Sequence, residues 1–165
     1  FEGSRFPPTG WETIQTNGLW SRENVGGSYN WVAYFYSYGL VGGSGLLRTA
    51  GYNLDSGRYR VSFVFSYREQ REGSGGTTAA YARVQWKDGN VWRLVAGQSL
   101  PLNTSLRSYS FEYEGVRQAT YRLFFRAVAD PTTKVLFRVD NVKWESGPFS
   151  GVGPASFGQV KALFH

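Results

Sequence analysis

The chain has 165 residues and a net charge of +6, and it contains 21 glycines, one histidine, no cysteine and no methionine. A chain of this length can bury one ordinary hydrophobic core, so we expect a single domain. The lack of cysteine excludes disulfides, thiolate metal sites and cysteine nucleophiles. Because the chain starts at Phe1 and lacks methionine, we expect a processed product or a segment of a longer protein.

Alternating apolar and polar residues predict β-strands along most of the chain. In chain order the predicted strands are residues 11–15, 31–37, 46–48, 58–67, 81–86, 91–95, 109–113, 121–127 and 135–139. The Asp88-Gly89 pair between two of them is typical of a hairpin turn. The glycine-rich strings at 42–45 and 73–76 are also predicted to be turns.

These strands predict an all-β fold, a two-sheet antiparallel jelly-roll sandwich formed by residues 1–145. Residues 146–165 are expected to form a Gly/Pro linker and a short apolar tail. Ser156 and Gln159 fit a helical capping box, and the tail's apolar residues share one helical stripe. A helix this short needs a surface to lie on, either a neighbouring copy or its own domain, unless the tail is a sorting signal that is removed.

Two stretches carry a family resemblance, namely residues 1–11 (FEGSRFPPTGW) and 137–142 (FRVDNV). Together with residues 57–63 (GRYRVSF), they resemble the cleaved-adhesin or choice-of-anchor J type of jelly-roll domain. That group is similar in fold to MAM domains and to many carbohydrate-binding modules. The resemblance covers residues 1–145 and implies secreted or cell-surface proteins that bind or adhere and do not catalyse.

The resemblance also implies that the first and last strands lie side by side, which would bring Glu2 near Asp140. Two carboxylates and backbone carbonyls are ligands that a structural Ca²⁺ prefers. The alternative is that Glu2 pairs with an arginine while Asp140 accepts backbone N–H groups at a β-bulge.

Aromatic residues are the strongest indication of a binding surface. Within residues 28–38, alternation places Tyr34, Tyr36 and Tyr38 on one face. The opposite face, which we expect to be core, carries Trp31, Ala33 and Phe35. Exposed tyrosines suit sugar stacking or protein contact, and structural packing is the alternative.

Other kinds of function are not favoured. An arginine-rich surface can attract nucleic acid, anionic lipid or acidic polysaccharide, but the arginines are scattered singly along the strands, so we expect no nucleic-acid partner. The single histidine, His165, is the last residue, which argues against a histidine-centred triad or a zinc site. The spacing of the 12 acidic residues singles out no carboxylate pair, so we expect no enzyme. No apolar run is long enough to span a membrane.

The favoured hypothesis is a non-catalytic, extracellular adhesive or structural sandwich that self-associates through its ends as a subunit of a surface assembly or filament. The residues expected to make that contact are Phe1, Phe157, Val160, Leu163 and Phe164. The alternative is a carbohydrate-binding module that stacks sugars on exposed tyrosines or tryptophans, and a third, weaker hypothesis is a glycoside-active enzyme.

Overall fold

The computed structural model describes residues 6–26, 31–37, 42–71 and 78–148. These residues form strands and turns without a helix, so the predicted all-β sandwich is confirmed. In chain order the strands are β1 (Trp11–Thr16), β2 (Gly18–Asn24), β3 (Trp31–Ser37), β4 (Gly43–Thr49), β5 (Tyr52–Leu54), β6 (Gly57–Arg71), β7 (Thr78–Asp88), β8 (Val91–Ser99), β9 (Asn103–Gly115), β10 (Ala119–Ala129) and β11 (Thr133–Gly147).

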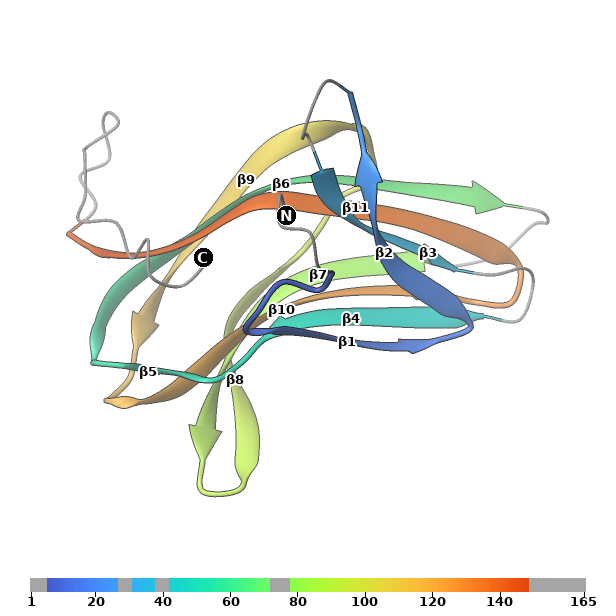
Figure 1. Cartoon of the computed structure of the whole chain (residues 1–165). Helices are drawn as coiled ribbons and strands as arrows, with labels where there is room; N and C mark the ends of the chain where they lie inside the picture. The colour runs from blue at the N-terminus through green and yellow to red at the C-terminus, as the bar shows by residue number, and fades with distance from the viewer. Residues whose placement is uncertain (1–5, 27–30, 38–41, 72–77, 149–165) are drawn as a thin grey trace.

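The strands form two antiparallel sheets that pack on one another (Figure 1). Sheet A has the order β1-β4-β10-β7-β8, and the short strand β5 also pairs with β10. Sheet B has the order β2-β3-β11-β6-β9. In Figure 1, sheet B forms the upper layer, and the β7–β8 hairpin of sheet A projects at the bottom. Each sheet therefore has one face in the core and one outer face.

The first strand that the family resemblance implied, around Glu2, lies outside the described residues, so its pairing with the last strand stays a prediction. The first of the described strands, β1, pairs with β4 in sheet A, whereas the last, β11, lies between β3 and β6 in sheet B. The first and the last of the described strands therefore lie in different sheets. Residues 1–5 lie outside the described residues.

The predicted hairpin joins β7 and β8. Asp88 lies opposite Val91, and Gly89 between them has a φ of 59°, in the left-handed region that glycine adopts without a steric penalty. The Asp-Gly pair therefore supplies the backbone conformation that this tight turn requires.

The core consists of inward-facing aromatic and branched side chains from both sheets. Phe63 of β6 meets Phe125 of β10 across the sandwich in an edge-to-face contact, with ring centroids 5.0 Å apart. Both rings are almost fully buried. Burying one such side chain contributes about 1.5–3 kcal/mol of stability. The alternating residues of the long strands stabilise the sandwich because they place many such side chains in the core.

The predicted turn at residues 42–45 is wrong in part, because β4 begins at Gly43. Gly43 and Gly45 are buried and face the core. A Cβ atom on Gly45 would overlap the Phe35 ring and lie 2.6 Å from Trp20 Nε1. Glycine is needed here because the two sheets approach closely, and not because the chain turns.

Candidate functional site

The predicted tyrosine face is present on β3. Ala33 and Phe35 are buried in the core, while Tyr34 and Tyr36 are half-buried and lie on the outer face of sheet B. Their ring centroids are 6.5 Å apart and their planes differ by 17°. We call this stacked pair, Tyr34 and Tyr36, the tyrosine platform. Tyr38 lies outside the described residues.

An ion pair holds one side of the platform. Arg138 of β11 donates two hydrogen bonds to the carboxylate of Glu23, at 2.6 and 3.1 Å, and its guanidinium carbon lies 5.6 Å from the ring centroid of Tyr34. Burial, followed by the charge of Glu23, raises the pKa of Tyr34. The Tyr34 phenol is therefore neutral at physiological pH, and the two-point ion pair fixes the guanidinium beside it.

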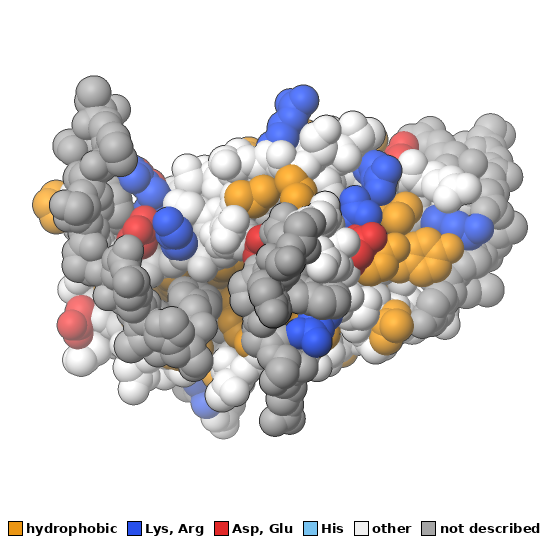
Figure 2. Space-filling model, turned by 45° about the horizontal axis from the view of Figure 1, so that its top comes forward, with side chains coloured by type: hydrophobic (Ala, Val, Ile, Leu, Met, Phe, Trp, Pro, Cys, Tyr) orange, Lys and Arg blue, Asp and Glu red, His pale blue; other side chains and the backbone are white. Residues whose placement is uncertain are grey.

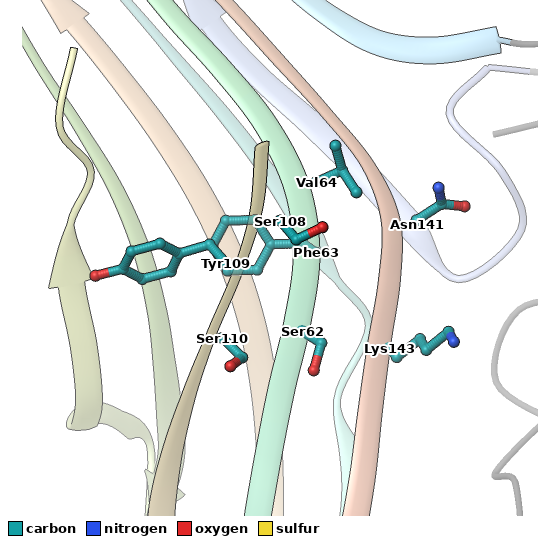
Figure 3. A pocket seen from close by; sticks show the side chains of 8 residues that line it. All are labelled: Ser62, Phe63, Val64, Ser108, Tyr109, Ser110, Asn141 and Lys143. Carbon is teal, nitrogen blue, oxygen red and sulfur yellow. The ribbon is translucent and has the colours of Figure 1, made fainter. Parts of the chain in front are cut away.

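A hollow with a volume of about 670 Å³ lies on the same outer face of sheet B. We call it the serine trough, and the side chains that define it are Ser62, Val64, Ser108, Ser110, Asn141 and Lys143. Figure 3 shows these side chains along β6, β9 and β11, whereas the rings of Phe63 and Tyr109, which also contribute to the lining, extend away from the trough.

The trough is hollow because small residues occupy neighbouring positions. Ser62 lies opposite Ser110, and Val64 lies opposite Ser108. A β-bulge interrupts β11 between Asp140 and Lys143, as the alternative for Asp140 predicted. A bulge redirects the side chains of the strand that contains it. Asn141 lies at this bulge with a φ of 49°, and it lines the trough.

Ion pairs line one end of this face. Glu112 of β9 accepts hydrogen bonds from Arg58 at 2.6 Å and from Arg60 at 2.5 Å. The hydrogen bond from Arg60 is the main cause that lowers the pKa of Glu112, so this carboxylate stays ionised at neutral pH. Glu114 and Glu145 lie opposite Arg58 and Arg60 in the strand register. The positive charges at this end are therefore balanced by carboxylates.

Figure 2 brings the upper layer of Figure 1 toward the viewer. Hydrophobic side chains, among which tyrosine is counted, lie there beside side chains of both charges. The face thus combines apolar surface with side chains of both charges.

The trough offers hydroxyl, amide and ammonium groups, with the tyrosine platform nearby on β3. None of the described residues that line it is an aspartate, a glutamate or a histidine. This lining can donate and accept hydrogen bonds with a neutral polyhydroxylated ligand. It does not supply the carboxylate pair that glycoside hydrolysis uses.

Asp140, one of the two predicted calcium ligands, is buried at the β-bulge, with 7% of its surface exposed. Its predicted partner, Glu2, lies outside the described residues. Among the described residues, no group of three or more histidines, aspartates or glutamates could hold a metal ion. They therefore provide one carboxylate of the predicted pair, and the calcium site stays a prediction.

The predicted self-association residues also lie outside the described part of the chain, namely Phe1, Phe157, Val160, Leu163 and Phe164. The hypothesis that the tail docks on a neighbouring copy therefore stays a prediction. In the described ranges, no helix is long and apolar enough to cross a membrane.

The serines of the trough were not predicted from the sequence. Ser108 and Ser110 alternate with Tyr109 and Phe111 on β9, and Ser62 precedes Phe63 on β6. Small polar residues that alternate with core aromatics on two strands are a usable signal. It becomes informative only when the strands are known to be neighbours.

Comparisons with known proteins support this description of the fold. No family model matches the chain, and no curated protein matches it. Among solved structures, it is similar to the enzymatically active domain of tailspike protein 4 of bacteriophage CBA120, with a TM-score of 0.60 and 13% identity over 84% of this chain and 19% of that one. The likeness thus spans about a fifth of the tailspike chain.

Two smaller structures are matched over nearly their whole length. One is a family 4 carbohydrate-binding module, CBM4, with a TM-score of 0.55 and 13% identity over 85% of this chain and 96% of that one. The other is the N-terminal cellulose-binding domain of β-1,4-glucanase C from Cellulomonas fimi, with a TM-score of 0.53 and 13% identity over 87% and 92%. The chain has the β-sandwich fold of carbohydrate-binding modules. The resemblance to the cleaved-adhesin type in particular is not supported by any family model and stays a prediction.

Proposed function

We propose that the chain is a non-catalytic carbohydrate-binding module that holds a neutral polysaccharide on the outer face of sheet B. The observation that carries this proposal is the placement of the tyrosine platform and the serine trough on one face. Aromatic rings with a polar group suit sugar rings, and the trough's volume lies within the roughly 300–1,000 Å³ common for ligand sites.

A polymer can reach both parts of this site at once. In the strand register, Tyr34 lies opposite Arg138, and Arg138 lies opposite Ser66 on β6, the strand that also carries Val64 of the trough. The platform on β3 is therefore two strands away from β6, or about 10 Å at the usual strand spacing. A ligand of several sugar units that crosses the strands would contact the platform and the trough together.

Charge balance is the reason to propose a neutral ligand. Lys143 is the one charged residue among the described residues that line the trough. Around it, Arg138 is paired with Glu23, and Arg58 and Arg60 share Glu112. A strongly charged polymer would have to displace these pairs, whereas a neutral polysaccharide would not.

The folds that are matched favour this proposal over the self-associating subunit that the sequence favoured. Two of the structures described above are carbohydrate-binding or cellulose-binding domains. The bacteriophage domain is enzymatically active, but the trough described here lacks a carboxylate pair among its described lining residues. A binding module for polysaccharides would act outside the cell or at its surface, and we include that location in the proposal.

The tyrosine platform provides the test. Affinity electrophoresis of the full chain in hydroxyethyl cellulose, galactan and mixed-linkage glucan identifies a neutral ligand, and calorimetry then gives its affinity. We expect Tyr34→Ala and Tyr36→Ala each to weaken binding about tenfold, because each removes one stacking surface.

The matched control is Tyr81→Ala, since Tyr81 is a half-buried tyrosine on the outer face of sheet A. This variant should bind the neutral polysaccharide as the original chain does. The proposal would be contradicted if the Tyr34 and Tyr36 variants bound with the same affinity as the original chain. It would also be contradicted if the original chain bound none of the polysaccharides tested.

A further inference from the structure

The strand register gathers four arginines on the outer face of sheet A. Arg48 of β4 and Arg83 of β7 both lie opposite Phe124 of β10. Arg122 and Arg126 lie two residues before and after Phe124 on the same strand and hence on the same face. These arginines are scattered in the sequence, but the sheet brings them together. We call the four the arginine face.

Phe124 marks the centre of this group. It points away from the core, because its neighbours Leu123 and Phe125 are the fully buried residues, yet only 8% of its surface is exposed. Long alkyl stems of neighbouring arginines can cover an apolar ring in this way while their charged ends stay in water. At the backbone, the four positions form a diamond with diagonals of about 14 Å along β10 and about 10 Å across the strands.

Among the described residues, one of the four arginines of the arginine face forms an ion pair with a carboxylate. Arg48 forms an ion pair with Glu12. Arg122 donates a hydrogen bond of 2.9 Å to the neutral amide of Gln85. Neither Arg83 nor Arg126 forms an ion pair with a carboxylate of a described residue.

Two of the guanidinium groups are held in place by aromatic rings. Arg83 lies over the ring of Tyr81, with its guanidinium carbon 4.3 Å from the ring centroid. Arg122 lies over the ring of Trp92 at 4.0 Å. Gly97 makes room for Arg83, because a Cβ atom there would lie 2.5 Å from Arg83 Cγ. Side chains ordered before binding lose less entropy when a ligand binds.

The arginines also repel one another. Burial is the first cause that lowers the pKa of Arg122, and the charge of Arg48 is the second. Arginine remains protonated at neutral pH all the same. An anion placed among these side chains would relieve the repulsion.

From this geometry we propose that the arginine face binds a carboxylated polysaccharide, at a second site on the opposite side of the sandwich from the tyrosine platform. The planar guanidinium matches a carboxylate through two parallel hydrogen bonds. A polyuronate presents carboxylates repeatedly along a chain, so several arginines can be engaged at once. The proposal does not depend on neutral-polysaccharide binding by sheet B.

A nucleic acid fits the face less well. Single strands bind through bases that stack on open aromatic rings. Here the rings of Tyr81 and Trp92 each have one face covered by an arginine. The guanidinium groups are therefore the main groups offered to a ligand, and they recognise anionic groups, not bases.

The test compares polygalacturonate with its fully methyl-esterified form, which has the same sugar backbone without the charges. We expect the full chain to bind polygalacturonate in calorimetry and to bind the ester at least tenfold more weakly. The double variant Arg83→Gln/Arg126→Gln should weaken polygalacturonate binding about tenfold, because two exposed charge pairs are lost. Because salt screens such pairs, raising the salt from 0.1 M to about 1 M should have a similar effect.

Arg107→Gln is the matched control, since Arg107 is an exposed arginine on β9 of sheet B, and it should bind as the original chain does. Circular dichroism and a thermal melt establish that each variant is folded. Equal affinity for the polymer and its ester would overturn the proposal. So would an unstructured oligothymidylate that binds as tightly as polygalacturonate and is weakened by the same double variant, because the face would then bind any polyanion.

Discussion

The two outer faces of the sandwich are built by the same alternation of strand residues, yet they differ in how some of their arginines are paired. On sheet B, arginines are matched by glutamates, as in the pairs Arg138–Glu23 and Arg60–Glu112. On sheet A, Arg83 and Arg126 have no ion pair with a described carboxylate. The two faces therefore differ in whether these arginines are paired with carboxylates of described residues.

The difference also extends to shape. Small residues such as Ser62 and Ser110 hollow the outer face of sheet B. At the centre of the arginine face, Phe124 fills the surface and is buried among its neighbours. A hollow lined mostly by neutral polar groups suits a ligand that fits into it, whereas a filled, charged face suits a ligand that lies on top. One sandwich thus presents two outer faces of different shape and polarity around a single core.

Filling the serine trough should have the largest effect. We expect Ser110→Trp to weaken binding of a neutral polysaccharide more than about thirtyfold, because the indole would occupy the hollow. Ser110 is exposed, so the free energy of unfolding should change by less than about 0.5 kcal/mol. Calorimetry and urea unfolding measure the two quantities.

The control for this variant is Ser56→Trp, which places the same side chain at an exposed bend before β6. It should leave both affinities unchanged. If Ser110→Trp keeps the affinity of the original chain for the neutral polysaccharide, the trough is not part of the site.

The second prediction concerns the core that both faces share. We expect Gly45→Ala to lower the free energy of unfolding by about 1–3 kcal/mol, because the added methyl group overlaps the Phe35 ring. Ser44→Ala, at the adjacent half-buried position, should change it by less than about 0.5 kcal/mol. Equal urea midpoints for the two variants would show that the sheets do not approach closely at Gly45.

The sequence predicted the core better than it predicted the surfaces. Buried aromatics such as Phe63 and Phe65 recur at every second position, so strands and their inward faces follow from one segment at a time. Strand β2 was missed because its residues Ser21, Arg22 and Glu23 are polar and interrupt the alternation. Gly45 was predicted to lie in a turn. Glycine occurs both in turns and where two sheets approach closely, and the sequence alone does not distinguish the two.

The candidate sites were predicted only where they lie on one strand. Tyr34 and Tyr36 are two residues apart, and their shared face follows from alternation. The serine trough and the arginine face each combine residues from three strands, for example Arg48, Arg83 and Arg126. Which strands are neighbours depends on the topology of the whole sandwich, and alternation within one strand does not determine it.

The smallest expected effect is a loss of stability at alkaline pH, and it concerns tyrosines in the core that both faces share. Burial is the main cause that raises the pKa of Tyr67 from 10.0 to about 12, and burial likewise raises the pKa of Tyr113 and Tyr59. Because the pKa of Tyr67 is higher in the folded chain, the stability that this phenol contributes is complete below pH 10 and is lost as the pH rises from about 10 through about 12.

We therefore expect the melting temperature to fall as the pH rises through that range. Tyr67→Phe removes one titrating group and should make the fall less steep, as thermal melts at several pH values would show. A melting temperature independent of pH above 10 would contradict the burial of these phenols.

The central claim is that the two faces bind different polysaccharides independently. It is tested most directly by measuring a neutral polysaccharide and polygalacturonate, in parallel, with Ser110→Trp and with Arg83→Gln/Arg126→Gln. We expect a crossed result, in which Ser110→Trp loses only the neutral ligand and the arginine variant loses only polygalacturonate. A folded variant that loses both ligands to the same extent would contradict it.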